Sequence, residues 1–335
     1  MMNKNDDLSI ELFNLLDTYK YTLDLVEKAV ELLEKGADVN YKQIEYPYET
    51  SLYRCLSSGK SEYKLNMVEL LIANGADVNL VADIFSPLSQ AVMKNDIEIV
   101  QLLLKNGAND FSYSLKNAIE QDKIEMVQLL ISYGGKCNCF EDYNCSFLEF
   151  CNEPFRLKKE DYHYEKTPGL AIAELLISCG ANPNGVENGT SSPISEAIRH
   201  DFIELVHLLL QNGAVFTDEL IFYCNTLEMT NFLLEKDIFD NTFCKNLRGE
   251  NVLIYNAMQS NYELVHYWIN SGIDLYDFDK QGFTAFHYLV MKEKIDVFEQ
   301  FLPYFDIKKC NAIQPILDLI DHKKMKAQIE EMLID

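Results

Sequence analysis

The stretch ELLIANGADVN occupies residues 69–79, and nearly the same letters, ELLEKGADVN, occupy residues 31–40. With the glycine of GADVN as a marker, further copies of the phrase follow along the whole chain, and successive markers lie about 33 residues apart on average. A period of this length is typical of repeat architectures, in which one short unit is stacked many times. The markers are Gly36, Gly75, Gly107, Gly134, Gly180, Gly213 and Gly272, with Asp237 and Phe305 at the marker position of two further copies.

Each copy predicts a pair of short helices. Ahead of the marker, as in IEIVQLLLKNG at 97–107, apolar residues recur at helical spacing, and glycine then favours the left-handed conformation that ends many helices. A second signature lies further upstream, as SPLSQAV at 86–92, YSLKNAI at 113–119, SPISEAI at 192–198 and TAFHYLV at 284–290. One such helix pair cannot bury its own apolar face, so neighbouring pairs must stack to form a continuous core.

These letters resemble the ankyrin repeat, whose consensus contains G-x-T-P-L-H-x-A-A followed by a second helix that ends in G-A-D-V-N. The stretch DKQGFTAFHYLV at 279–290 matches best, with Gly282, Thr284, Phe286 and His287 at the consensus positions. The resemblance implies an all-α ankyrin-repeat solenoid of about ten helix–turn–helix units with short, partly missing hairpin fingers. It assigns His287 a hydrogen-bonding role in the repeat, and the helical stripe around Trp268 places that side chain in the core.

The predicted organisation is a single array over residues 1–335. The spacings before Gly134 and Asp237 are too short for a finger, so we expect tight turns there, whereas 152–169 reads as a surface insertion. Polar faces at both ends indicate capping units. We expect an N-terminal cap at 9–40, repeats at 50–79, 86–110, 113–138, 145–184, 192–215, 218–239, 251–276 and 284–307, and a C-terminal cap at 314–335.

Composition limits the possible partners. The chain has 335 residues, 29 Lys and Arg against 53 Asp and Glu, and a net charge of −24, so it should repel phosphate backbones and anionic membrane surfaces. No apolar run is long enough for a bilayer, and no general secretory signal is visible. Nine scattered cysteines without a disulfide pattern favour a reducing cytoplasm. We therefore expect no direct binding of nucleic acid or membrane.

Candidate chemistry is sparse. Cys137, Cys139, Cys145 and Cys151 lie close together with His163 nearby, but their spacing lacks the C-x2-C pairs of structural zinc sites, and Cys137 and Cys151 take inward positions of the repeat. No nucleophile, phosphate-loop, dinucleotide or zinc-protease motif is present. We expect no enzyme, cofactor or metal; an enzyme site in the 141–169 insertion, requiring Cys139, Cys145 or His163, stays an alternative.

The resemblance also implies where a partner would bind. Ankyrin arrays generally bind proteins along the concave face formed by finger tips and first helices, and the residues that follow the alanine pair of each first helix vary with the partner. At these positions after the first helices, the resemblance also predicts Asn152, Glu153, Asn225 and Thr226 as contact residues. The predicted partner-binding residues are Phe85, Met93, Lys94, Glu120, Gln121, Arg199, His200, Arg248, Met258, Gln259, Lys280, Phe283, Met291 and Lys292.

The leading functional hypothesis is a non-enzymatic protein–protein interaction module that binds a protein partner through its concave face. Many Asn, Lys, Ile and Tyr residues indicate an AT-rich genome, which favours a bacterium or virus over an animal. The open roles are a bacterial effector delivered into a host cell, an antagonist of a host or defence protein, and an intracellular adaptor. The alternative is an acidic inhibitor that mimics nucleic acid and blocks a DNA- or RNA-binding protein. We expect a cytoplasmic protein and assume a monomer.

Overall fold

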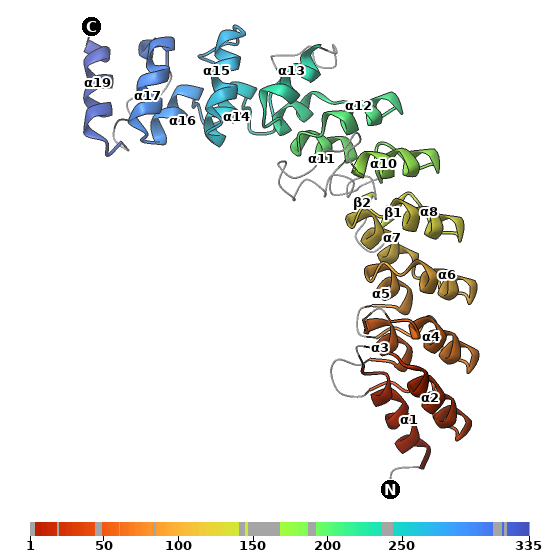
Figure 1. Cartoon of the computed structure of the whole chain (residues 1–335). Helices are drawn as coiled ribbons and strands as arrows, with labels where there is room; N and C mark the ends of the chain where they lie inside the picture. Colours follow the sequence, from red (N-terminus) through yellow and green to blue (C-terminus); the bar gives the residue numbers. More distant parts are fainter. Residues whose placement is uncertain are drawn as a thin grey trace. The chain divides into compact units, whose positions relative to one another are not determined.

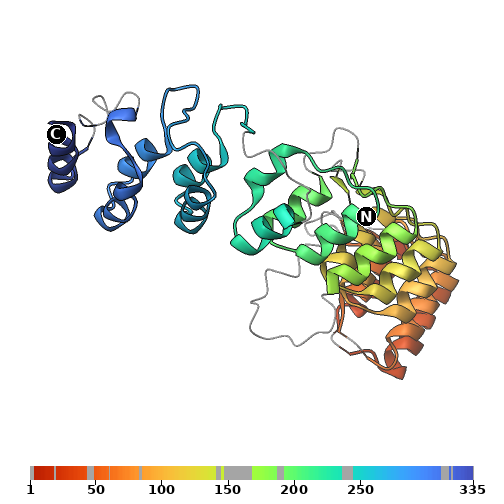
Figure 2. The same cartoon turned by 90° about the horizontal axis from the view of Figure 1, so that it is seen from above.

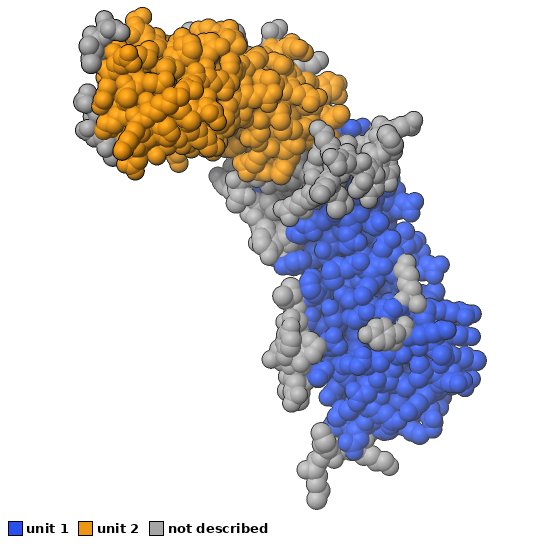
Figure 3. All heavy atoms as spheres, turned by 60° about the vertical axis from the view of Figure 1, so that its left-hand side comes forward, with its two compact units in different colours: residues 1–192 blue, residues 193–335 orange. Residues whose placement is uncertain are grey.

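The computed structural model describes residues 4–18, 20–43, 49–59, 61–82, 85–140, 145–146, 168–186, 192–235, 244–310, 317 and 320–334. The chain divides into two compact units, Met1–Ser192 and Pro193–Asp335, which are coloured separately in Figure 3. The division falls directly before the first helix of one repeat, where the predicted array is continuous. Within each unit the described residues form helix pairs stacked in sequence order, which confirms the all-α ankyrin-type fold (Figure 1).

Unit 1 stacks first helices beside one another and second helices beside one another, as Figure 2 shows for its orange and yellow segments. The only strands in the described part of this unit are a two-residue antiparallel pair, β1 (Cys139–Phe140) and β2 (Cys145–Ser146), which forms a hairpin finger. The first helices are α1 (Lys4–Leu15), α3 (Ser51–Ser57), α5 (Pro87–Met93) and α7 (Phe111–Glu120); the second helices are α2 (Leu23–Glu34), α4 (Lys64–Ala73), α6 (Ile97–Lys105), α8 (Ile124–Ser132) and α10 (Pro168–Ser178).

Unit 2 repeats the plan with one departure. The first helix of its second pair is a 3-10 helix, η3 (Asp218–Tyr223), where the sequence predicted an ordinary helix pair over 218–239. A 3-10 helix rises about 2.0 Å per residue against 1.5 Å in an α-helix, so six residues reach further across this short repeat. The remaining elements are α11 (Pro193–Arg199), α12 (Ile203–Gln211), α13 (Leu227–Glu235), α14 (Val252–Gln259), α15 (Tyr262–Asn270), α16 (Ala285–Met291), α17 (Ile295–Phe301), η4 (Leu302–Tyr304), η5 (Ile307–Lys309) and α19 (Lys323–Ile334).

Small and apolar side chains close the interfaces between neighbouring pairs. The alanines of the first helices, Ala91, Ala118, Ala197 and Ala257, are at most 1% exposed. Because an alanine side chain ends at Cβ, the backbones of adjacent first helices can approach closely at these positions. On the second helices, leucine and valine fill the space between layers, and each such side chain contributes about 1.5–3 kcal/mol when fully buried. Trp268 is 1% exposed, which confirms its predicted place in the core.

The marker glycines take the backbone conformation that the sequence predicted. Gly107 has φ of +88°, and a Cβ built on it would meet no atom within 4 Å. Glycine is therefore required there by its conformation and not by crowding. Phe305, at the marker position of a later copy, has φ of −111°; η4 continues the chain from α17 instead, and Phe305 is buried with its ring 5.2 Å from that of Phe286.

Where the GADVN phrase keeps its asparagine in the N-terminal repeats, that asparagine joins one repeat to the next. The Asn40 side chain donates to the carbonyl oxygen of Gly75 at 2.9 Å and accepts from the amide of Asp77 at 2.7 Å. Asn79 makes the same pair of bonds one repeat further along the chain. A single amide thus satisfies a donor and an acceptor of the neighbouring turn, which explains why the phrase recurs with its asparagine.

Candidate protein-binding face

Side-chain caps fix where the first helices begin. In α5 the hydroxyl of Ser86 accepts from the amide of Ser89 at 3.1 Å, and in α14 the side chain of Asn251 accepts from the amide of Ile254 at 2.9 Å. In α16 Thr284 forms a capping box with the buried imidazole of His287, whose Nδ1 lies 3.0 Å from the Thr284 amide nitrogen. This confirms the hydrogen-bonding role that the consensus implied for His287.

After five of the first helices, α5, α7, α11, α14 and α16, a residue within two positions of the helix end takes a left-handed conformation although it is not glycine. Asn95, Asp122, Asp201, Ser260 and Glu293 have φ between +53° and +63°. At these positions the chain turns sharply into the second helix, and the last residues of these five first helices are half-buried or exposed. The predicted partner-binding residues lie at this end of the first helices and on the fingers. We call this surface the first-helix face.

In unit 1 the first-helix face presents a mixed set of side chains. Met93 and Phe85 are half-buried, and Phe85 pairs with Ala82 through two backbone hydrogen bonds of 3.1 Å that close a finger. Lys94 and Gln121 are exposed. Glu120 is half-buried and forms an ion pair with Lys116 one helical turn earlier. Phe85 is thus less available to a partner than an outward-pointing phenylalanine would be.

In unit 2 the same positions are more exposed and more basic. Arg199, His200, Gln259 and Lys292 are exposed, and Met258 and Met291 are half-buried. The guanidinium carbon of Arg199 lies 4.9 Å from the centre of the Tyr223 ring, while its Nη1 lies 3.3 Å from Oε1 of Glu196. The side chain of Arg199 is therefore held at the surface between a ring and a carboxylate.

Two fingers of unit 2 are built around buried carboxylates. Asp279 is 4% exposed and accepts from the amides of Gln281 and Phe283 at 2.8 and 3.0 Å and from the Tyr288 hydroxyl at 2.5 Å. Burial, followed by the bond to Asp279, raises the pKa of Tyr288. The Phe283 ring stacks on His287 with ring centres 5.4 Å apart, so this predicted outward phenylalanine is partly covered by its own repeat.

The second finger carries the other predicted cations. Glu250 is 2% exposed and accepts from the Asn246 side chain at 2.6 Å, and Arg248 stands over it with 3.9 Å between Nη1 and Oε1. The Arg248 side chain stays 72% exposed. The amide of Lys280, on the neighbouring finger, donates to the Arg248 carbonyl oxygen at 3.0 Å. Arg248 and Lys280 are therefore fixed next to each other, with Lys280 exposed to solvent.

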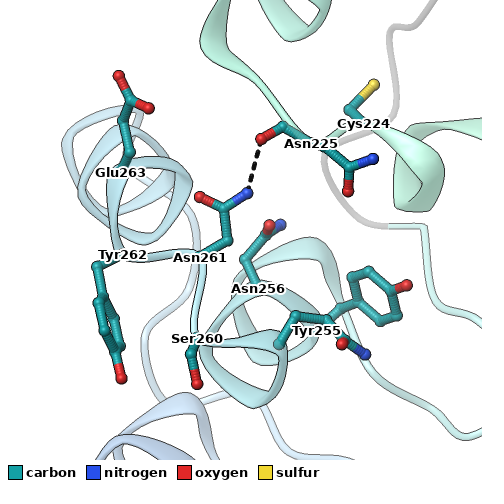
Figure 4. A pocket seen from close by; sticks show the side chains of 9 residues that line it. Cys224, Asn225, Tyr255, Asn256, Ser260, Asn261, Tyr262 and Glu263 are labelled. Carbon is teal, nitrogen blue, oxygen red and sulfur yellow. Dashed lines mark hydrogen bonds between the residues drawn. The ribbon is translucent and has the colours of Figure 1, made fainter. Parts of the chain in front are cut away.

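A pocket of about 570 Å³ opens at the ends of η3 and α14 (Figure 4). Predicted contact residues Asn225 and Gln259 line it, together with Tyr255. The Asn261 side chain points to the Asn225 carbonyl oxygen and donates to it at 2.9 Å, and the Asn225 side chain in turn donates to the Arg199 carbonyl oxygen at 2.9 Å. These two hydrogen bonds from side-chain amides connect the wall of the pocket to the end of α11.

The sequence mapping missed the tyrosines of this region. Tyr223 is 36% exposed beneath Arg199, and Tyr255 is half-buried with its ring centre 5.4 Å from that of Phe222. Tyr255 and Tyr288 occupy the variable position x of T-P-L-H-x-A-A, one residue before the alanine pair. Extending the mapping to that position would have found both of them.

Little in the described residues suggests catalysis. They contain no group of three or more His, Cys, Asp or Glu side chains arranged to hold a metal ion. Cys137 is buried, as its inward register predicted, and its thiol donates to the Cys179 carbonyl oxygen at 3.0 Å. Burial raises the pKa of the Cys137 thiol. Cys151, His163, Asn152 and Glu153, and the side chains of Cys139 and Cys145, lie outside what the structure describes, as does nearly all of the 152–169 insertion.

No helix within the described ranges combines the length and the apolar content that crossing a bilayer requires.

Comparison with known proteins places the chain in a family. A family model described as Ankyrin repeats (3 copies) matches residues 22–114 and 55–141, and one described as Ankyrin repeats (many copies) matches residues 253–302. Together these matches cover half of the chain, which belongs to the ankyrin-repeat family. Ankyrin repeats are generally protein–protein interaction modules and are typically non-enzymatic.

Individual relatives are distant. Alpha-latrocrustotoxin-Lt1a of Latrodectus tredecimguttatus is 21% identical over 262 residues, a match that covers 77% of this chain and 14% of the toxin. Among solved structures, the human ASB11 ankyrin repeat domain is 18% identical with a TM-score of 0.44, covering 73% of this chain and 89% of that domain. An ankyrin repeat domain from Acinetobacter baumannii AYE is 22% identical with a TM-score of 0.48, covering 62% and 98%.

Proposed function

We propose that this chain is a non-enzymatic module that binds a protein partner through the first-helix face. One contrast carries the proposal. In α5, α7 and α11 the alanine is at most 1% exposed, whereas Lys94, Gln121 and Arg199, two or three residues further along the chain, are exposed. The buried positions are uniform from repeat to repeat and the exposed ones differ in charge and size, as expected of a constant scaffold that presents a specific surface.

The scaffold also favours binding energetically. Helix caps, left-handed turns and the asparagine bridges of unit 1 hold the backbone of the face before any partner arrives. Side chains on such a backbone lose less conformational freedom on binding than side chains on a loose loop, so more of the contact energy appears as affinity. The half-buried methionines, Met93, Met258 and Met291, add apolar area that adapts to the shape of a partner.

The proposal is tested by affinity capture from lysate of the source organism or its host, with cross-linking to retain weak partners. The test variant replaces Arg199, Met258 and Met291 by alanine. The control replaces Glu204, Glu228 and Asn270, exposed residues on the second helices α12, α13 and α15. Partners that the control retains and the test variant loses support the proposal, provided both variants keep the wild-type circular dichroism and melting temperature. Partners retained equally by both variants would overturn it.

The net charge of −24 favours one competing function, inhibition of a nucleic-acid-binding protein by an acidic surface. That function predicts capture of basic proteins, with affinity that falls steeply as salt rises and that is insensitive to the three alanine substitutions. Repeating the capture at low and high salt with both variants separates the two functions.

A further inference from the structure

The predicted contact positions of unit 2 differ in charge from the rest of the chain. The one acid among the predicted helix and finger positions is Glu250, which is buried, although Asp and Glu outnumber Lys and Arg by 53 to 29 in the whole sequence. The cations among them are Arg199, Arg248, Lys280 and Lys292, with His200 beside Arg199. Because the net negative charge already keeps the protein soluble, a basic surface on it indicates a site that attracts an anionic partner.

Several of these groups surround one side chain, Tyr255. Burial raises the pKa of its hydroxyl, and Glu250 and Tyr223 act in the same direction, whereas Arg199 and Arg248 act in the opposite direction. The geometry agrees: Arg199 lies over Tyr223, whose neighbour Phe222 packs against Tyr255 with ring centres 5.4 Å apart. The finger that carries Arg248 leads into Asn251, whose carbonyl oxygen accepts from the Tyr255 amide at 3.0 Å. Since Lys280 bonds to the Arg248 backbone and Arg199 lies over Tyr223, these five residues form one contiguous surface of unit 2. We call it the Arg–Tyr surface: Arg199, Tyr223, Arg248, Tyr255 and Lys280.

Nearby acids do not neutralise this surface at its outer side. Glu250 and Asp279 are 2% and 4% exposed, and hydrogen bonds from their own fingers hold both carboxylates. Glu196, whose side chain is 17% exposed, contacts Arg199 and His200 from below. These three carboxylates are therefore mostly buried while the cations are exposed, so that Arg248 and Arg199 keep donors for an incoming anion. A fourth carboxylate, Glu263, is exposed and lines the pocket.

The Arg–Tyr surface also offers apolar area and depth. The ring of Tyr223 is partly exposed, Met258 follows Ala257 at the end of α14, and the pocket beside Tyr255 measures about 570 Å³. A partner that supplied charge alone would leave this area unused. The combination of fixed cations with aromatic rings fits a chain that carries carboxylates and large side chains together.

We propose that the Arg–Tyr surface binds an acidic protein segment with interspersed aromatic residues. Its carboxylates pair with Arg199 and Arg248, and an aromatic side chain packs against Tyr255 at the mouth of the pocket. A nucleic acid is disfavoured because the surplus of acids on the rest of the chain repels a long phosphate backbone, whereas a short acidic segment meets only the local cations. This inference rests on the proposed function and adds the chemistry of the partner.

The experiment uses the full-length chain and fluorescent synthetic polymers as probes: a random copolymer of Glu and Tyr, poly-Glu, a random copolymer of Lys and Tyr, and single-stranded oligo-dT. The test variant is Arg199→Glu with Arg248→Glu. The control, Lys308→Glu with Lys323→Glu, makes the same change in net charge at exposed positions on η5 and at the start of α19. A neutral pair, Arg199→Gln with Arg248→Gln, serves if the reversed pair does not fold.

We expect the Glu–Tyr copolymer to bind wild type more tightly than poly-Glu does, and any binding of the Lys–Tyr copolymer to the acidic chain not to be weakened in the test variant. The test variant should bind about tenfold or more weakly, since two charge-assisted contacts are lost, while the control changes affinity less than about twofold. Absence of Glu–Tyr binding, equal weakening in both variants, or tighter binding of oligo-dT at the same surface would each overturn the inference. Because lysate capture tests the first-helix face without assuming an acidic partner, it can succeed when this experiment fails.

Discussion

The bridging role of Asn79 leads to a quantitative prediction about how the repeats hold together. Its side-chain amide donates to the Gly107 carbonyl oxygen at 3.0 Å and accepts from the Asn109 amide at 3.0 Å, so replacing Asn79 by alanine removes two bonds between repeats. A hydrogen bond contributes about 0.5–1.5 kcal/mol net, and these groups can bond to water instead when the bridge is lost. We therefore expect Asn79→Ala to lower the free energy of unfolding by about 1–2 kcal/mol.

Asn74→Ala is the matched control. The Asn74 side chain donates one bond, to the Leu70 carbonyl oxygen at 2.9 Å, within its own helix. We expect a loss of about 0.5 kcal/mol there, since only one exposed bond disappears. Unfolding in urea gives the change in the free energy of global unfolding. Hydrogen exchange at the Asn109 amide reports on the junction between the two repeats. Its protection factor should fall about tenfold if the junction loses about 1.4 kcal/mol.

The result that would refute the bridge is specific. If Asn79→Ala and Asn74→Ala lose the same free energy within about 0.5 kcal/mol, and exchange at Asn109 is unchanged, the asparagine does not couple the repeats. The recurrence of GADVN would then need another explanation, such as a role of the asparagine within its own turn.

Further predictions concern the core, the turns and pH. Gly107→Ala should cost about 1 kcal/mol in thermal unfolding, because only the positive φ opposes it; a loss above about 3 kcal/mol would indicate a clash that the structure does not contain. Trp268→Ala should lower the free energy of unfolding by about 3–5 kcal/mol. Trp268→Phe should lower it clearly less, because Nε1 of the buried Trp268 has no hydrogen-bond partner among the described residues that the substitution would remove. Burial raises the pKa of Cys55 from 9.0 to about 11, so its contribution to stability is complete below pH 9 and is lost as pH rises towards 11, at up to about 1.4 kcal/mol per unit. Urea unfolding across this range should show a shallower decline for Cys55→Ala than for wild type, and an unchanged slope would contradict the assignment. At pH 8, mass spectrometry should find the exposed Cys179 alkylated well before Cys55.

The sequence by itself determined the repeat and much of its interior. The period, the helix pairs and the left-handed conformation of the marker glycines follow from local patterns, because helix formation and chain reversal depend on residues a few positions apart. The burial of Trp268 and the capping box of His287 were predictable for the same reason, since a repeat consensus encodes both register and local hydrogen bonds. The predicted division into one array over 1–335 with its repeat boundaries stays a prediction.

Only the tertiary structure decided what lies between repeats. The 3-10 geometry of η3 depends on the distance a short repeat must cover, and the bridge from Asn79 to Gly107 joins turns that only stacking brings together. The placement of Arg199 over Tyr223 and of Lys280 next to Arg248 draws on separate repeats, and no single-repeat pattern contains it. The physical reason is that a repeat sequence specifies each module and its contact edges, whereas the chemistry of a surface arises from the sum of edges that packing sets side by side.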